Sequence, residues 1–388
     1  MSVVPVSDMD QAKRPNAGLI GQRGSREKLS TPCLVLDLDA MERNISTMGA
    51  MCRNAEWSLR PHAKTHKSIE VARRQLAEGA KGVAVATIGE AECFQRAGLG
   101  DILITSPIPP GLKMDRLIRL AALSGSITCV ADSRECIRLL QAAAGEAETT
   151  LPVLIDVDMG RHRSGVTSPD QAVALAKEIG ASANLELRGL QAYAGHLSHM
   201  TDFAARSADA AVAARRIADV VSALEDEEVH LECVSGGSTG TVFIEPGLNQ
   251  LTEMQCGSYV FMDLEYDVVD LDGRQSRPFE PALFVRTTVI SKNVADIATV
   301  DAGRKHFATK LGTAPQIWPN EGFYQMKPES DEHGRISVVA GEDRLQVGMS
   351  FECFIPHCDP TANLFNEYHV CRKDTLVDIW PIDARGAI

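Results

Sequence analysis

The sequence predicts an α/β protein in which a (β/α)8 barrel is followed by a separate all-β domain. From residue 30 onward, short β-branched segments alternate with amphipathic segments of helical period, which is typical of βα units around a parallel sheet. The first predicted strand is not followed by GxGxxG, which argues against an open dinucleotide-binding sheet. Beyond residue 275 strand-like segments follow one another without helical period. We therefore place the barrel at 25–275 and the β domain at 276–388, with part of 1–24.

Eight segments have the length and apolar content of barrel strands, and amphipathic segments such as 39–51, 68–79 and 202–224 separate them. Asp39 and Ser68 are candidate N-caps. The predicted barrel strands are 32–38, 57–62, 82–87, 101–105, 127–131, 152–158, 187–193 and 231–235. The predicted strands of the β domain are 282–290, 297–301, 336–340, 345–355 and 368–371.

The composition excludes several classes of protein. With 388 residues, 44% hydrophobic and 23% charged, the chain has ordinary globular usage. The net charge is −13 without a run of Lys or Arg, so we expect neither nucleic acid nor a membrane surface as partner. We find no apolar segment near the roughly 20 residues that span a bilayer, and no signal peptide in 1–24. Ten cysteines without a CxxC pair indicate reduced thiols and predict a cytoplasmic protein.

Candidate functional residues lie where barrel strands end, because the active sites of such barrels form at the carboxyl ends of the strands. Lys64 follows the second predicted strand, where barrel walls can desolvate its ammonium group and suit it to covalent chemistry. A solvated loop charge is the alternative. After the eighth predicted strand come a Gly/Ser/Thr loop and a Cys-Gly-Ser-Tyr segment, whose amides and hydroxyls can bind phosphate. A plain turn is the alternative there.

A reactive lysine and a phosphate loop at one end of a barrel predict pyridoxal 5′-phosphate as the cofactor. Two further strand ends carry candidates for contact with it or with the substrate. Arg163 can donate to a ring nitrogen or a carboxylate, and Tyr193 can stack or donate its hydroxyl. His196 and His199 follow Tyr193, with pKa values suited to proton transfer. Each of these residues could instead be structural or form a surface ion pair.

His357 and Asp359 in the β domain are candidate metal ligands. In an extended strand, side chains two residues apart point to the same face, whereas Cys358 would face away. A nitrogen and oxygen pair favours a hard or intermediate divalent ion. The alternative is a His–Asp hydrogen bond in a turn before Pro360.

Taken together, the motifs resemble the family of D-threonine aldolase, 3-hydroxy-D-aspartate aldolase and D-serine dehydratase, a branch of the alanine racemase-like pyridoxal phosphate enzymes. The resemblance covers about residues 30–385 in the family's order. It rests on 31–39 (TPCLVLDLD), 60–67 (RPHAKTHK), the GGSTG loop at 236–240, CGSY at 256–259, DEHG at 331–334 and HCDPT at 357–361.

The resemblance implies a cofactor-binding barrel and a β domain in a homodimer. By position, Lys64 would be the Schiff-base lysine, Arg163 would approach the pyridine nitrogen, Tyr193 would line the cofactor, and His199 would stand near the substrate hydroxyl. The phosphate would be held by Gly237, Ser238, Thr239, Gly257, Ser258 and Tyr259. His357 and Asp359 would bind the metal, which we expect to be manganese or magnesium, with zinc as a further option.

In this family the dehydratases resemble His-x-Cys and the aldolases His-x-Asp, so His357 and Asp359 favour cleavage of β-hydroxy-D-α-amino acids to glycine and an aldehyde or glyoxylate. The segments 84–92 and 162–165 resemble the dehydratase side, which keeps ammonia-forming dehydration of D-serine or D-threo-3-hydroxyaspartate as the alternative. A non-catalytic carrier of the cofactor is the third hypothesis. Such carriers resemble a lone barrel.

Overall fold

The computed structural model describes residues 14–124, 126–309 and 313–388, and the chain divides into two compact units. The barrel unit comprises Ile45–Tyr259, Tyr266–Pro278 and Gly386–Ile388. Within the described residues, the β unit comprises 14–44, Val260–Glu265 and the described part of Phe279–Arg385. Of the segment 1–24 that we assigned in part to the β domain, residues 1–13 lie outside the described residues.

Eight parallel strands form the sheet of the barrel unit, in the order β2-β9-β8-β7-β6-β5-β4-β3. A parallel bridge between His62 and Ala84 joins the ends of β2 and β3, so the sheet closes on itself. This confirms the predicted (β/α)8 barrel. The strands are β2 (Ser58–Leu59), β3 (Val83–Val85), β4 (Ile102–Ile104), β5 (Ile127–Ala131), β6 (Leu151–Asp156), β7 (Leu185–Ala192), β8 (Cys233–Gly236) and β9 (Glu253–Met254).

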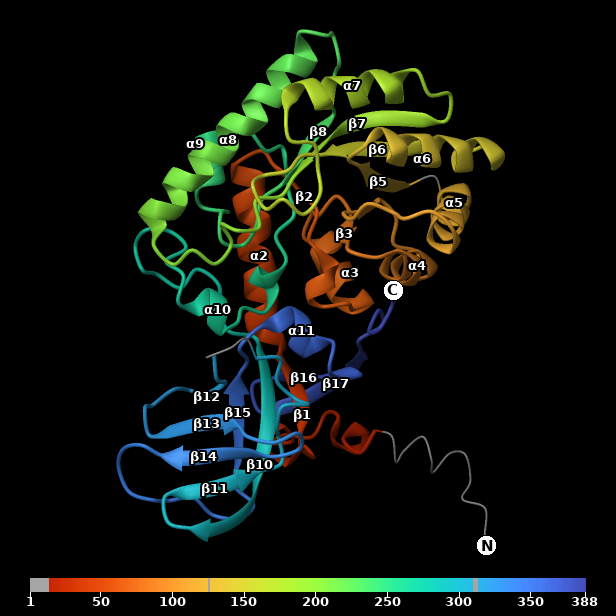
Figure 1. Ribbon diagram of the computed structural model, residues 1–388. Helices are drawn as coiled ribbons and strands as arrows, with labels where there is room; N and C mark the ends of the chain where they lie inside the picture. Colours follow the sequence, from red (N-terminus) through yellow and green to blue (C-terminus); the bar gives the residue numbers. More distant parts are fainter. Residues whose placement is uncertain (1–13, 125, 310–312) are drawn as a thin grey trace, which may run out of the picture. The chain divides into compact units, whose positions relative to one another are not determined.

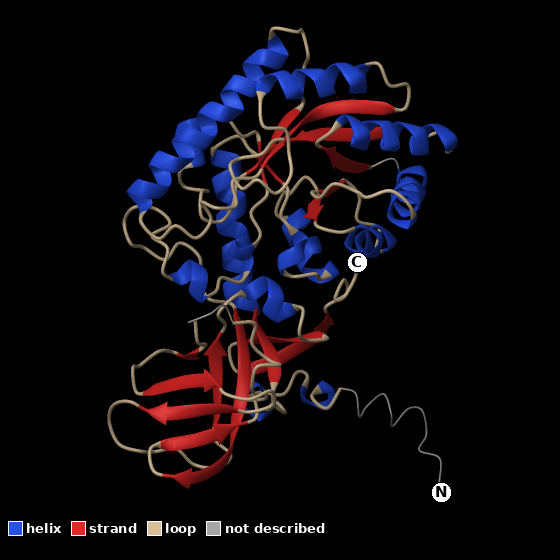
Figure 2. Ribbon diagram, viewed as in Figure 1, coloured by secondary structure: helices blue, strands red, loops and turns tan. Residues whose placement is uncertain are grey.

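Helices lie outside these strands, as Figures 1 and 2 show. Ser and Thr side chains cap several of them: Thr87 accepts from the amide of Glu90, and Ser168 from that of Gln171. The helices are α2 (Leu38–Asn54), α3 (Ile69–Ala77), α4 (Ile88–Arg96), α5 (Leu112–Ser124), α6 (Arg134–Glu146), α7 (Pro169–Gly180), α8 (Phe203–Glu225), α9 (Glu245–Leu248) and α10 (Leu264–Asp267). Short 3-10 helices are η1 (Ala17–Leu19), η2 (Arg26–Lys28), η3 (Ala63–Thr65) and η4 (Ser258–Val260).

Of the two predicted N-caps, Asp39 is wrong and Ser68 is confirmed by its position. Helix α2 begins one residue before Asp39, and it is Asp37 whose carboxylate accepts from the amide of Ala40. Ser68 occupies the N-cap position of α3, without a side-chain capping bond. Asp202 caps α8 by accepting from the amide of Ala205.

The β unit is built on a mixed sheet of nine strands (Figure 2). Its main path runs β13-β14-β11-β10-β1-β16-β17, and β15 pairs with both β10 and β12. The strands are β1 (Cys33–Asp37), β10 (Leu283–Val294), β11 (Ile297–Val300), β12 (Gln316–Trp318), β13 (Tyr324–Pro328), β14 (Gly334–Val338), β15 (Ser350–Phe354), β16 (Glu367–Arg372) and β17 (Thr375–Pro381). One short helix, α11 (Cys358–Ala362), precedes β16.

The first predicted barrel strand, 32–38, was assigned to the wrong sheet. As β1 it pairs antiparallel with β10 and parallel with β16, in the β unit. Four consecutive buried residues, Cys33–Leu36, suit any strand that is covered on both faces, so the pattern does not select the partner strands.

The eighth barrel strand is β9, which the sequence analysis missed because two residues carry no periodicity. The barrel strands must therefore be renumbered. Lys64 follows the first strand of the barrel, and the Gly/Ser/Thr loop follows the seventh. The Cys-Gly-Ser-Tyr segment follows the eighth. In the β unit, β12, β13 and β17 were also missed.

No helix within the described ranges is both long enough and apolar enough to cross a membrane.

Close packing of β7 against β8 generates the first prediction. Gly189 faces Cys233, and a Cβ added at Gly189 would lie 1.9 Å from the carbonyl oxygen of Cys233. We expect Gly189→Ala to push these strands apart and to lower the free energy of unfolding by about 1–3 kcal/mol or more. Urea unfolding followed by circular dichroism measures this.

The matched control is Gly180→Ala at the end of α7, where an added Cβ meets nothing within 4 Å. This variant should keep or slightly raise the free energy of unfolding, since alanine is the better helix former. Equal stability of both variants would contradict the close approach at Gly189.

Candidate active site

The predicted cofactor-binding segments follow five strands that are consecutive neighbours in the barrel: β2, β9, β8, β7 and β6. In this order the strands lead to Lys64, to the Gly257 segment, to the Gly237 loop, to Tyr193 and His199, and to Arg163. Because the strands are parallel, all five segments leave from the same end of the barrel. The topology thus brings together the barrel residues that the sequence analysis selected.

Tyr193 lies near both of the predicted cofactor-binding cations. Its ring centroid is 5.8 Å from Nζ of Lys64 and 6.0 Å from Cζ of Arg163. An added Cβ at Gly195 would lie 2.5 Å from Cε1 of Tyr193, so the absence of a side chain there lets the chain fold back against the ring. The tyrosine hydroxyl is 3.5 Å from Oγ of Ser198.

The turn that carries Lys64 is held by His62, which the sequence analysis did not select. The hydroxyl of Thr105 donates to the carbonyl of Val85, so it accepts from Nε2 of His62 at 3.1 Å. Nδ1 of the ring then accepts from the amide of Lys64 at 3.4 Å. Burial lowers the pKa of His62 well below its usual value, and the charge of Lys64 lowers it further. The imidazole is therefore a neutral support for the turn.

The two predicted phosphate loops contact each other and the Lys64 turn. Oγ1 of Thr239 accepts from the amide of Tyr259 at 3.0 Å. An added Cβ at Gly257 would lie 2.6 Å from Oγ1 of Thr65, so only glycine fits beside that turn. The hydroxyl of Ser238 is buried and has no hydrogen-bond partner among the described residues. It is thus available to a ligand.

The predicted phosphate ligands differ in how their side chains are engaged. Gly237 has φ of +72°, a conformation that suits glycine. Ser258 is buried at the start of η4. Tyr259 is fully buried and its hydroxyl accepts from Nε2 of Gln75 at 3.0 Å, so the contact of this side chain with a phosphate stays a prediction.

Asp158 shapes the loop that carries Arg163. Its Oδ1 accepts from the amides of Gly160, Arg161 and His162, each at 3.0 Å. Burial raises the pKa of this carboxyl, but the amide hydrogen bonds and the nearby His162 ring outweigh burial and hold it below its usual value. Ser164 then donates to Asp156 at 2.7 Å, which fastens the far side of the loop to β6.

His199 packs against an aromatic ring of the same unit. The ring centroids of His199 and Tyr266 are 4.5 Å apart. The ring is half-buried, whereas His196 is exposed. Of the two histidines considered, His199 is therefore the one held in a defined environment.

The candidate metal ligands belong to the β unit, and the expected extended geometry is wrong. His357 is extended, but Asp359 lies in the first turn of α11, so the two do not share a strand face. The Nδ1 atom of His357 is 3.2 Å from the buried Asp263 and 3.8 Å from Glu265. Burial alone would lower the pKa of His357, but the hydrogen bond with Asp263 and the charges of Asp263, Asp359 and Glu265 outweigh burial and raise it.

Asp263 was missed by the sequence analysis. It accepts from Nδ1 of His357 and from the amide of Cys358 at 2.9 Å, so it orients the ring and leaves Nε2 as the nitrogen directed away from it. A single acidic residue within the apolar segment 259–264 was the available signal. Within the part of the chain that is described, no three His, Cys, Asp or Glu side chains form a ready metal site.

The loop geometry at Asp158 generates the second prediction. We expect Asp158→Asn to lower the free energy of unfolding at pH 7 by about 1–2 kcal/mol, since hydrogen bonds to a charged acceptor are stronger than those to an amide oxygen. The folded pKa of Asp158 is depressed, so the stabilisation is present above the unfolded pKa and is lost as the pH falls through the folded pKa. The difference between the two proteins should therefore shrink below about pH 4.

Urea titrations at several pH values measure this difference. The control is Asp170→Asn, in the exposed first turn of α7, whose unfolding should change little at pH 7. A pH-independent difference at Asp158 would contradict the role of its charge.

Two family models and several known proteins match this chain. The family model of the alanine racemase N-terminal domain matches residues 36–265, and that of a serine dehydratase domain matches 282–371. The 3-hydroxy-D-aspartate aldolase of Paracoccus denitrificans (strain Pd 1222) is 38% identical over 92% of this chain and 93% of that protein. The crystal structure of D-threonine aldolase from Filomicrobium marinum superposes with a TM-score of 0.89 at 34% identity, covering 93% of this chain and 97% of that one.

Dehydratases are more distant. The D-threo-3-hydroxyaspartate dehydratase of Delftia sp. (strain HT23) is 31% identical over 91% of this chain and 97% of that protein. The aldolase prediction is therefore favoured over the dehydratase alternative. The chain belongs to the alanine racemase-like family of pyridoxal phosphate-dependent enzymes, on the branch of lyases that includes the 3-hydroxy-D-aspartate and D-threonine aldolases.

Proposed function

We propose that the protein is an aldolase, dependent on pyridoxal phosphate and a divalent metal, that cleaves β-hydroxy-D-α-amino acids to glycine and an aldehyde or glyoxylate. D-Threonine and 3-hydroxy-D-aspartate are the proposed substrates, the classes named for its relatives. The observation that carries the proposal is the order β2-β9-β8-β7-β6, which gathers the lysine, both Gly-containing loops, Tyr193 and Arg163 at one end of the barrel.

The residues at this end of the barrel fit the cofactor. Ser238 offers a buried hydroxyl that has no hydrogen-bond partner among the residues described, and Gly237 and Gly257 leave room in their loops for a close ligand. Lys64 would bind the cofactor covalently, Arg163 would face the pyridine nitrogen and Tyr193 would line the ring. The proposed phosphate contacts are Gly237, Ser238, Thr239, Gly257, Ser258 and Tyr259. When bound, the cofactor supplies an electron sink for the bond that breaks at Cα of the substrate.

His357 and Asp359 fit a divalent metal by their donor atoms. A neutral imidazole nitrogen and a carboxylate oxygen suit manganese or magnesium, and also zinc. Because Nδ1 is engaged by Asp263, His357 would bind through Nε2. When bound, the metal supplies Lewis acidity that lowers the pKa of the substrate's β-hydroxyl.

His199 is the proposed general base. It would accept the proton of the β-hydroxyl as the Cα–Cβ bond breaks, and packing against Tyr266 restricts the orientation of its ring. In the dehydratase alternative, which the segments 84–92 and 162–165 favour, Lys64 would instead remove the Cα proton and hydroxide would leave. The two reactions differ in their products.

Two further properties belong to the proposal. The enzyme would act as a homodimer, as the family resemblance implies. It would work in the cytoplasm, a prediction that rests on ten cysteines, all free of disulfides in the structure.

A product assay tests the proposed reaction. Metal-stripped, cofactor-loaded protein is incubated with D-threonine or D-3-hydroxyaspartate, with and without manganese. We expect glycine to form with manganese and to fall to a small fraction without it, because the β-hydroxyl loses its Lewis acid. Lys64→Ala should abolish detectable turnover.

The same assay separates the alternatives. Ammonia and a 2-oxo acid in place of glycine would replace the aldolase proposal with the dehydratase one. A protein that binds the cofactor but turns over neither substrate under any condition would favour the carrier.

The metal ligands are tested by metal binding as well as by activity. Asp359→Ala should raise the manganese concentration for half-maximal activity by at least about tenfold, because one of two protein ligands is lost. Isothermal titration with manganese should show the same loss of affinity. Glu342→Gln, an exposed substitution in the β unit, is the control and should leave both quantities unchanged. Unchanged manganese affinity in Asp359→Ala would contradict its assignment.

A further inference from the structure

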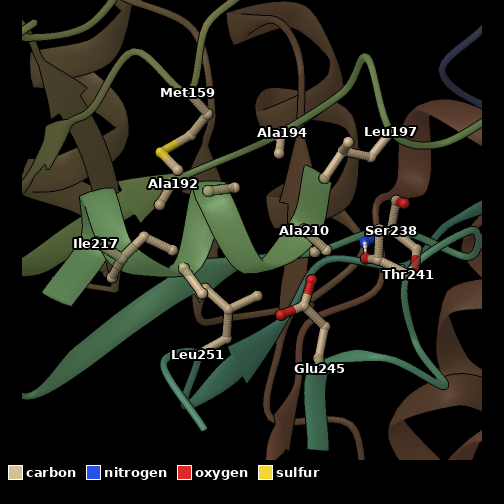
Figure 3. Close-up of a pocket in the computed structure, with 13 residues that line it drawn as sticks. Met159, Ala192, Ala194, Leu197, Ala210, Ile217, Ser238, Thr241, Glu245 and Leu251 are labelled. Atoms are coloured by element: carbon tan, nitrogen blue, oxygen red, sulfur yellow. Dashed lines mark hydrogen bonds between the residues drawn. The ribbon is translucent and has the colours of Figure 1, made fainter. Parts of the chain in front are cut away.

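Glu245 is a buried carboxyl that the proposed reaction does not use. It begins α9, four residues after Thr241, and is 8% exposed. Figure 3 shows its carboxyl directed toward Ala210 of α8 and the Ser238–Thr241 turn. The adjoining cavity has a volume of about 20 Å³, enough for one water molecule.

A short series of contacts joins Glu245 to the proposed phosphate loop. The amide of Glu245 donates to the carbonyl of Thr241 at 3.1 Å, and the two side chains line the same cavity. Oγ1 of Thr241 accepts from the amide of Ser238 at 3.1 Å, and the amide of Thr241 donates to the carbonyl of Ser238 at 3.1 Å. These bonds fix the backbone of Ser238, whereas its hydroxyl has no hydrogen-bond partner within the described part of the chain. Thr241 thus lies between Glu245 and the residue proposed to contact the phosphate.

The described residues that line the cavity beside Glu245 include no compensating charge. Within the described residues that line the cavity, Glu245 is the only ionisable side chain. Apolar side chains of β7, of α8 and of the segments that follow β6 and β7 line the cavity, among them Met159, Ala192, Leu197, Ala210 and Ile217. Cys256, which follows β9, interacts electrostatically with Glu245, and burial raises the pKa of its thiol. Burial also raises the pKa of Glu245 to about 7, although the nearby hydroxyl of Thr241 opposes this.

We propose that Glu245 controls the charge behind the phosphate loop, and that its carboxyl must carry a proton for a phosphate-bearing cofactor to bind tightly. The neutral carboxyl places no charge in the cavity that it shares with Gly237 and Ser238. An ionised carboxylate behind the same turn repels the phosphate dianion through a medium of low dielectric constant. The inference rests on the proposed function, because it takes Ser238 to be a phosphate contact.

The test is the pH dependence of cofactor affinity. Dissociation constants of pyridoxal phosphate are measured by titrating cofactor-free wild-type protein and Glu245→Gln from pH 6 to pH 9. Ionisation of the cofactor itself affects both proteins equally. The ratio of the two dissociation constants therefore reports only the ionisation of Glu245. We expect this ratio, wild type over variant, to be near one at pH 6 and to rise to about ten at pH 8.5, which corresponds to about 1.4 kcal/mol.

Pyridoxal, which lacks the phosphate, provides the control ligand. Its ratio should stay constant with pH. Glu225→Gln at the exposed end of α8 is the control variant and should match wild type throughout. Thr241→Val should weaken binding of pyridoxal phosphate without restoring it at low pH, whereas Thr241→Ser should retain it.

Loss of folding is excluded by melting temperatures. Since the folded pKa of Glu245 is raised, its destabilising effect grows as the pH rises through that value, and Glu245→Gln should melt higher than wild type at pH 8. A flat ratio for pyridoxal phosphate, or an equal rise for pyridoxal, would overturn the inference. Equal affinity of pyridoxal phosphate for Lys64→Ala, Ser238→Ala and wild type would instead refute the proposed cofactor site.

Discussion

Backbone pairing between β2 and β9 is the interaction on which the barrel unit depends. It is short, with Ser58 opposite Glu253 and Leu59 opposite Met254, yet it joins the first barrel strand to the last. Without it the sheet would be open, and the Lys64 turn would have no neighbour carrying Gly257. The buried pair of Arg60 and Glu253, whose Nε and Oε1 are 2.8 Å apart, ties the same two strands through their side chains.

Glycine determines how closely the loops at the carboxyl end of the barrel can approach each other. Added Cβ atoms would lie 2.2 Å from the carbonyl oxygen of Ala192 at Gly236, and 2.2 Å from that of Ser198 at Gly240. Both contacts are with backbone atoms, which cannot move aside without a large cost in free energy. The glycines therefore act by allowing contact between neighbouring loops.

Buried polar side chains support the segments that carry the candidate residues. His62 supports the Lys64 turn, Asp158 closes the Arg163 loop, and Asp263 orients His357 in the β unit. Each accepts at least one hydrogen bond from a backbone amide or an imidazole, so each fixes a loop whose own side chains point elsewhere. Glu245 differs, because it lies in apolar surroundings and its charge state can change near neutral pH.

The sequence by itself determined the fold class and most of the strands, because alternation of β-branched and amphipathic segments reflects burial on two faces. It also selected Lys64, Arg163 and Tyr193, since polar residues at strand ends stand out against apolar strands. Only the tertiary structure decided the partners of β1 and the existence of β9, because apolar runs specify burial and not a neighbour. The sequence analysis did not select the supporting residues His62, Asp158 and Glu245, because their roles depend on how the loops turn, and for Asp263 the only signal was an acidic residue within an apolar segment.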